Sequence, residues 1–346
     1  MSLSNPSQLL MRNSDLLEAD HPLLVNLPAD GFIGAYLEEY PDSKLTCFNN
    51  NFEQYQALRQ NYRGKAEFVF DSQYRSGQKH DLVVIAFPKS KAELAYTLAM
   101  INPQLTEKTL VLIVGENKGG VKSTGKLAAD YLHHIAKVDS ARHCTLFSGQ
   151  ANTELPPFDM QAWFKHYHFT LGDIKLEIAS LPGVFSQNAL DKGTELLLHH
   201  LPAQLDGSLL DFGCGAGVIS CFIGKKYPKA QLTLLDVSAL ALASAEKTLA
   251  LNGLSGKVFP SNSLSEVREK YQHIVSNPPF HQGVKTHYVA TESFLRQIKA
   301  HLKPRGSVTV VANNFLSYKP IMEQAIGTTT TVANEKGFAI YHSRIK

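Results

Sequence analysis

Apolar segments of strand length alternate along the chain with amphipathic segments of helix length. In residues 209–236 an apolar run leads into a turn of small residues, an amphipathic stretch, a Tyr-Pro pair and a second apolar run. A helical stretch at 291–302 likewise precedes a β-rich run at 307–313. Strands that alternate with helices of about 10–15 residues are typical of βαβ units. The pattern therefore predicts an α/β fold on a parallel sheet.

The same pattern occurs twice. Residues 24–49 repeat the order of 209–236, and in both segments the second strand ends eight residues after the proline of the Tyr-Pro pair. Residues 81–89 match 272–280 in the same way, with a proline at the corresponding place. Chance similarity between two βαβ units is the alternative, but agreement at turn positions favours a duplication.

We therefore expect two copies of one doubly wound α/β unit in tandem, at residues 1–160 and 170–346. The 346 residues are enough for two domains of roughly 100–200 residues each. The join between the copies carries the adjacent prolines Pro156 and Pro157, which suits a linker.

Composition excludes several classes of protein. Apolar residues make up 44% of the chain and charged residues 19%, as in a folded domain. No apolar run approaches the roughly 18 residues of a membrane span, and the N-terminus lacks the pattern of a secretory signal. The four cysteines form no CxxC pair and no zinc spacing with the 14 histidines. We expect a cytoplasmic protein without a membrane span, a disulfide framework or a bound metal.

The second copy carries a glycine-rich turn. An apolar strand ends at Asp211, and Gly213, Gly215 and Gly217 open the next helix. Glycines allow positive φ and close approach to a ligand, and a helix N-terminus offers unpaired N–H groups. Asp236 ends the second strand, where a carboxylate can accept hydrogen bonds from ribose hydroxyls. A structural turn with no ligand is the alternative, but the spacing fits a loop that receives a nucleoside with an amino-acid tail.

A second motif, Asn277-Pro278-Pro279-Phe280, directly follows the strand at 272–276. Two consecutive prolines fix φ and remove two donors. The Asn277 amide and the Pro278 carbonyl then become rigid acceptors for the two hydrogens of a planar NH₂ group, and Phe280 supplies a flat face for stacking a base. A plain turn is the alternative, because Asn-Pro often starts one.

Together these motifs resemble the class I S-adenosylmethionine-dependent methyltransferases that act on amino nitrogens. The segments at 137–142, 181–198 and 261–267 narrow the resemblance to enzymes that methylate N2 of a guanine in 16S rRNA of the small ribosomal subunit. The resemblance implies two tandem Rossmann-like domains, no metal, a monomer and catalysis by the Asn277–Phe280 loop. It also implies that S-adenosylmethionine is held by eight residues: Asp211, Gly213, Cys214, Gly215, Gly217, Asp236, Asn262 and Phe185.

The first copy lacks the chemical groups of the second. Val25 falls at the place of Asp211, Asn49 at that of Asp236 and Ala86 at that of Asn277. The acids that would hold a cofactor and the amide that would hold an amine are absent. We expect a degenerate domain with a structural or RNA-docking role.

The sequence leaves the substrate open. Another planar amine, such as adenine N6 in tRNA or DNA or a release-factor glutamine, would suit the same loop, and a noncatalytic RNA-binding assembly factor is a further alternative. Residues 1–170 hold 16 basic and 18 acidic side chains, whereas residues 171–346 hold 18 and 13. RNA should therefore contact the second half, and the basic residues expected to do so follow the proline loop: Lys285, Arg296, Lys299, Lys303 and Arg305.

Overall fold

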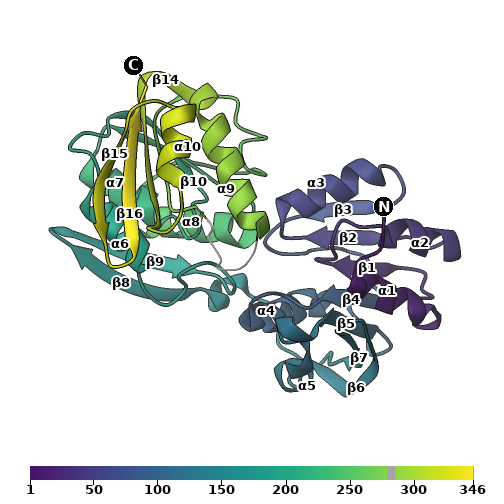
Figure 1. Ribbon diagram of the computed structural model, residues 1–346. Helices are drawn as coiled ribbons and strands as arrows, with labels where there is room; N and C mark the ends of the chain where they lie inside the picture. The colour runs from purple at the N-terminus through teal and green to yellow at the C-terminus, as the bar shows by residue number, and fades with distance from the viewer. Residues whose placement is uncertain (279–284, 346) are drawn as a thin grey trace. The chain divides into compact units, whose positions relative to one another are not determined.

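A computed structural model describes residues 1–278 and 285–345, and in it the chain forms two α/β units. The first unit comprises Met1–Trp163 and the second Phe164–Lys346. Each unit is built on a seven-stranded sheet (Figure 1). No helix within the described ranges is long and apolar enough to cross a membrane.

The first unit alternates strands with helices. Its strands cross the sheet in the order β3-β2-β1-β4-β5-β7-β6, and the first five of them run parallel. Its helices are α1 (Asn5–Arg12), α2 (Phe32–Glu39), α3 (Phe52–Asn61), α4 (Lys91–Ile101) and α5 (Thr124–Leu127). Its strands are β1 (Pro22–Val25), β2 (Thr46–Asn49), β3 (Glu67–Phe70), β4 (Leu82–Ala86), β5 (Leu110–Glu116), β6 (Leu132–Ala141) and β7 (Cys144–Ala151).

The second unit repeats this order as β12-β11-β10-β13-β14-β16-β15, preceded by a separate hairpin, β8–β9. Its helices are α6 (Lys192–His199), α7 (Val218–Lys226), α8 (Ala239–Leu251), α9 (Lys285–Gln297) and α10 (Tyr318–Ala325). Its strands are β8 (Lys165–Leu171), β9 (Ile174–Ser180), β10 (Gly207–Phe212), β11 (Ala230–Asp236), β12 (Lys257–Pro260), β13 (Tyr271–Ser276), β14 (Leu302–Asn313), β15 (Thr329–Glu335) and β16 (Phe338–Arg344).

The expected tandem α/β fold is confirmed, but the sheets are not wholly parallel. In each unit the last strand pair forms an antiparallel hairpin at one edge. Both hairpins turn through two residues of positive φ, Arg142 and His143 in the first unit and Lys336 and Gly337 in the second. Such turns match the twist of the flanking strands. These turns are hard to predict from the sequence, because three of the four turn residues are not the glycine, asparagine or aspartate that usually occupy these positions.

The strand registers correct the comparison of the two copies by one residue. Val25 pairs with Phe48, the residue before Asn49, and Phe212 pairs with Leu235, the residue before Asp236. Val25 is therefore the counterpart of Phe212, and the counterpart of Asp211 is the preceding residue, Leu24. The first copy still lacks the acid.

The core of the second unit lies on both faces of its central strands. Leu210, Ile274 and Val308 pair across β10, β13 and β14 and are fully buried on one face. Leu209 and Val275 are fully buried on the other face. Strands covered on both faces become nearly continuous apolar runs. This core holds the carboxyl ends of the strands, where the motifs begin, in a fixed position.

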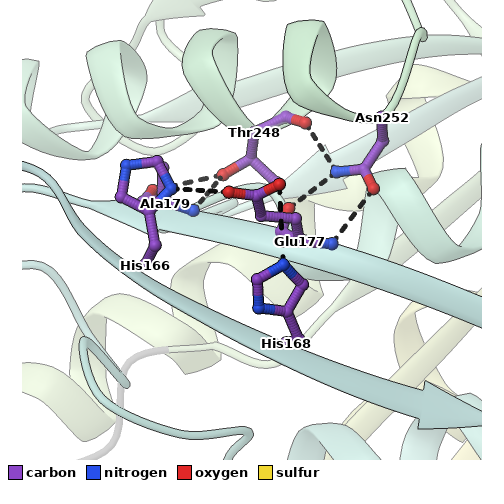
Figure 2. Close-up of polar contacts among 6 residues, drawn as sticks. All are labelled: His166, His168, Glu177, Ala179, Thr248 and Asn252. Atoms are coloured by element: carbon purple, nitrogen blue, oxygen red, sulfur yellow. Dashed lines mark hydrogen bonds and ion pairs between the residues drawn. The ribbon is translucent and has the colours of Figure 1, made fainter.

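The β8–β9 hairpin is attached to α8 through its backbone (Figure 2). The Thr248 hydroxyl accepts a hydrogen bond from the N–H of Ala179 and donates one to its carbonyl, both at 3.1 Å. The Asn252 amide accepts from the N–H of Glu177 at 3.2 Å and donates to its carbonyl at 2.7 Å. Helix side chains thus take the place of a neighbouring strand along this part of β9.

The residue spacing of α8 and of β9 explains why side chains of the helix reach successive backbone groups of the strand. Ser244, four residues before Thr248, accepts a hydrogen bond from the N–H of Leu181 at 3.0 Å. Four residues of helix rise about 6.0 Å, and two residues of strand rise about 6.6–6.8 Å. Side chains at every fourth helix position can therefore reach every second strand residue.

Thr248→Val tests this attachment. Valine keeps the shape but leaves both backbone groups of Ala179 buried without partners, a loss of about 1–3 kcal/mol. Hydrogen exchange of the peptide 174–181 should accelerate, whereas Thr248→Ser should keep it near the wild-type rate. Unchanged exchange in the valine variant would show that packing alone holds the hairpin.

Candidate functional site

The two motifs of the second unit lie on neighbouring strands. β10 pairs in parallel with β11 on one side and with β13 on the other. The chain first builds outwards through β11 and β12 and then returns to β13, so the strand order reverses beside β10. In open α/β sheets, ligands bind at this switch point, outside the carboxyl ends of the strands.

Two contacts join the ends of these strands. The buried Ser276 hydroxyl, at the end of β13, donates a 2.7 Å hydrogen bond to the carbonyl of Phe212, at the end of β10. The Phe212 ring stacks on Phe294 of α9, with ring centroids 3.7 Å apart and an interplanar angle of 16°. The loops that follow the strands are therefore held close together.

The glycine loop needs its glycines for backbone conformation and for space. The φ angles of Gly213, Gly215 and Gly217 are 70°, 52° and 78°. A Cβ on Gly217 would lie 3.1 Å from the Cα of Ala245, so a larger residue would push α7 away from α8. A Cβ on Gly215 would meet nothing within 4 Å, so the loop leaves open space at that point.

Asp211 is a buried acid with one unused oxygen. Its Oδ2 accepts hydrogen bonds from the backbone N–H and the hydroxyl of Ser220, at 3.1 and 2.7 Å. Its Oδ1 is buried and has no hydrogen-bond partner in the described chain. Burial raises the pKa of this carboxyl to about 7. Because a buried acceptor without a partner is costly, this oxygen suits a cationic group supplied by a ligand.

The Asp236 carboxylate binds a backbone group of the glycine loop. Its two oxygens accept backbone N–H bonds from Gly215 at 3.0 Å and Ser238 at 2.9 Å. Desolvation raises the pKa of the carboxyl, and these bonds oppose the rise. Each carboxylate oxygen can accept a second hydrogen bond, so capacity for two ribose hydroxyls remains.

The other residues expected to hold a cofactor differ in their surroundings. Cys214 is buried in the glycine loop, and burial raises the pKa of its thiol well above the usual value, which excludes a thiolate nucleophile. Asn262 is half-buried and follows Ser261, whose N–H bonds to the carbonyl of Asp236 at 3.0 Å. Phe185, in the segment between β9 and α6, is 58% exposed.

The Asn277 side chain is fixed by two residues that sequence reasoning missed. Its Nδ2 donates to Asp191 Oδ2 at 3.1 Å and to Thr194 Oγ1 at 2.9 Å. Asp191 also caps α6 by accepting the N–H of Thr194 at 2.9 Å. An acid before an apolar helical run is a recognisable N-cap signal, but nothing in it indicates a contact with Asn277. Pro278 is buried, and Pro279 and Phe280 lie outside the described residues.

Two of the five basic residues expected to contact RNA, Lys303 and Arg305, lie away from the two motifs. Lys303 and Arg305 lie at the start of β14, whose pairing with β13 places them at the opposite edge of the sheet. The Arg296 guanidinium is paired with Glu292 at 2.6 Å. Contact of these basic residues with RNA stays a prediction.

In the first unit, the polar groups beside the equivalent loop differ from those of the second unit. Asn49 donates to the carbonyl of Leu27 at 3.2 Å, so its amide is a donor to the loop where Asp236 is an acceptor. Leu24, at the place of Asp211, is buried and apolar. Across both units, the described residues include no group of three or more potential metal ligands.

Comparisons with known proteins agree with this geometry. Residues 7–167 match the family model "Methyltransferase small domain N-terminal", and residues 175–342 match "Methyltransferase small domain". A ribosomal RNA small subunit methyltransferase C of Colwellia psychrerythraea is 56% identical, with 100% of this chain and 99% of that protein covered. The one of Aeromonas hydrophila subsp. hydrophila is 40% identical, with 99% of each covered.

A solved structure shares the whole fold. It is a T. thermophilus 16S rRNA N2 G1207 methyltransferase in complex with AdoMet and guanosine. The TM-score is 0.84 at 20% identity, with 99% of this chain and 92% of that one covered. The resemblance to tandem class I methyltransferases is thereby confirmed, and the extent of the match to the curated relatives shows that the chain belongs to the ribosomal RNA small subunit methyltransferase C family.

Proposed function

We propose that this protein transfers a methyl group from S-adenosylmethionine to the N2 amine of a guanine in 16S rRNA. The target is guanosine 1207 in the numbering used for the T. thermophilus structure. The observation that carries the proposal is the fixed Asn277 amide, one strand away from a glycine loop with a buried, unpaired acid oxygen. The family relationship selects rRNA among the planar amines that such a loop suits.

The cofactor would be held at the carboxyl ends of β10 and β11. Asp211 offers its free oxygen to a positive group, and Asp236 offers lone pairs to the ribose. The loop Gly213, Cys214, Gly215 and Gly217 supplies backbone contacts and open space. Contacts of Asn262 and Phe185 with the cofactor belong to the same proposal. When bound, the cofactor supplies an electrophilic methyl group.

The chain's part in the reaction is to orient the amine. The Asn277 oxygen and the Pro278 carbonyl each accept a hydrogen bond from one N–H group of the guanine amine. These two hydrogen bonds direct the lone pair of the nitrogen away from the ring. Holding two reactants in such an alignment contributes several kcal/mol to lowering the barrier. A base stacked in a helix cannot enter a loop site, so the guanine must be unpaired or flipped out. Stacking on Phe280 and rigidity from Pro279 belong to the same proposal.

The first unit has no catalytic role in this proposal. The donor amide at Asn49 and the missing acid at Leu24 favour a domain that stabilises the chain or docks RNA. The partner is 16S rRNA, within the small ribosomal subunit, in the cytoplasm, and the protein acts as a monomer.

The first test is methylation itself. Purified protein and labelled cofactor are incubated with naked 16S rRNA and with small subunits, and the product is digested to nucleosides. Label should appear in N2-methylguanosine. Asn277→Ala should lower the single-turnover rate about 10²–10³-fold, as for loss of one preorganised polar contact, with little change in cofactor affinity. Ala86→Asn added to that variant should restore nothing. A near-normal rate in Asn277→Ala would favour a purely structural turn.

Calorimetry should find one S-adenosylmethionine site per chain. Asp236→Ala should weaken binding by about 1.5–3 kcal/mol, the range for hydrogen bonds to a charged group. The matched control is Asn49→Ala, at the equivalent place in the first unit, which should leave affinity unchanged. A second site, or loss of affinity in the control, would contradict the assignment of the cofactor to the second unit.

The raised pKa of Asp211 predicts a pH effect on stability. The folded pKa is about 7, against about 3.9 in an unfolded chain. Between these values the folded chain keeps a proton that the unfolded chain has released, so the free energy of unfolding falls as pH rises from about 4 to 7. Asp211→Asn should lose this decline and exceed the wild type by up to about 4 kcal/mol at pH 8, while binding S-adenosylmethionine more weakly. Denaturation at pH 5–8 measures the first effect, and parallel pH profiles would contradict it.

A further inference from the structure

The two N–H groups of the Asn277 amide are both engaged inside the protein. One points to the Asp191 carboxylate at 3.1 Å and the other to the Thr194 hydroxyl at 2.9 Å. A primary amide has two donors on its nitrogen and two lone pairs on its oxygen. With both donors used on one side, the amide plane is fixed and the oxygen is directed to the other side.

Chemistry decides which end of the amide faces Asp191. A carboxylate oxygen can only accept a hydrogen bond, so the amide oxygen in that place would oppose a second acceptor. The reversed amide is therefore disfavoured on chemical grounds. The hydroxyl of Thr194 accepts the other N–H and can donate elsewhere.

We propose that Asp191 and Thr194 are positioning residues that hold the Asn277 oxygen towards the amine to be methylated. This inference rests on the proposed function, because it assigns the reason for which the Asn277 oxygen is presented. Neither residue touches the reacting atoms. Both act through Asn277, which lies 83 residues or more away in sequence.

The start of α6 is itself held firmly. Asp191 Oδ2 accepts both the Thr194 N–H that caps the helix and the Asn277 amide. A Cβ on Gly193 would lie 3.0 Å from the ring of Phe338, so the first turn of α6 packs closely against β16. The helix cap and the positioning of the amide therefore share one carboxylate oxygen on a rigid support.

A neighbouring hydroxyl provides a matched control. Tyr167 Oη is buried and has no hydrogen-bond partner in the described chain. Burial and the nearby Asp191 carboxylate raise the pKa of this phenol to about 12. Removing a buried hydroxyl that bonds to nothing costs little, so Tyr167→Phe changes the surroundings of Asp191 without touching the amide.

The test uses Thr194→Val in the full-length protein. Valine keeps the shape and the helix but removes the acceptor, and a poorly aligned amide should lower the single-turnover rate about 10–100-fold at saturating S-adenosylmethionine. Cofactor affinity should stay unchanged. Thr194→Ser should restore most of the rate, and Tyr167→Phe should match the wild type. A Thr194→Val rate within twofold of wild type would overturn the inference.

A double-mutant cycle separates positioning from a general structural effect. In the Asn277→Ala background, Thr194→Val should cause no further loss, because the residue through which it acts is gone. An equal loss in both backgrounds would overturn the inference and leave Thr194 as a structural residue. A normal single-turnover rate in Asn277→Ala alone would also overturn the inference.

Side-chain amide NMR tests the same geometry without activity. With ¹⁵N-asparagine labelling, the Asn277 NH₂ pair is the one missing from the Asn277→Ala spectrum. It should be sharp and slow to exchange in the wild type and faster in Thr194→Val. If the wild type methylates no rRNA but shows this pattern, the proposed function fails and the positioning holds. Fast hydrogen exchange of the Asn277 side-chain amide in the wild type would overturn the positioning role of Asp191 and Thr194 but not the proposed function.

Discussion

The whole site depends on the parallel pairing of β10 with β13. Because these strands are neighbours and run in the same direction, the loops that follow them emerge at one edge of the sheet. The Ser276 hydroxyl then joins the two strand ends through the carbonyl of Phe212. The glycine loop and the loop that begins at Asn277, some 60 residues apart in sequence, thus become adjacent.

Two polar side chains at this end of the sheet, Asp211 and Asn277, differ in which of their atoms have hydrogen-bond partners. Asp211 is left with a buried oxygen unpaired, a cost to stability that a positively charged ligand can relieve. Asn277 has its donors satisfied inside the protein and only its acceptor side available. The first arrangement favours binding of a cation, whereas the second favours precise orientation of a neutral amine.

Much of this could be predicted from the sequence, because it resides in local motifs. Asp211 and Asp236 lie at the ends of apolar strands, the glycine loop and Asn277 directly follow such strands, and parallel strands bring these ends together. What could not be predicted depends on distant contacts or on backbone geometry. Asp191 and Thr194 lie far from Asn277 in the chain, and their helix-cap pattern accounts for them without any further role. Three of the four residues in the hairpin turns, Arg142, His143 and Lys336, are not usual turn residues, and the one-residue slip at Val25 becomes visible only in the strand ladder.

The apolar Leu24 at the place of Asp211 has a consequence for the history of the chain. Both units share the seven-strand order and the same two-residue hairpin turn, so the duplication copied a complete fold rather than a half. A copy that holds no cofactor needs no buried carboxylate at this place. A copy freed from catalysis can accumulate substitutions that stabilise it, because activity and stability place opposing demands on the same positions. During synthesis this unburdened copy emerges first, so the part of the chain that folds earliest is the one whose sequence no longer has to accommodate an active site.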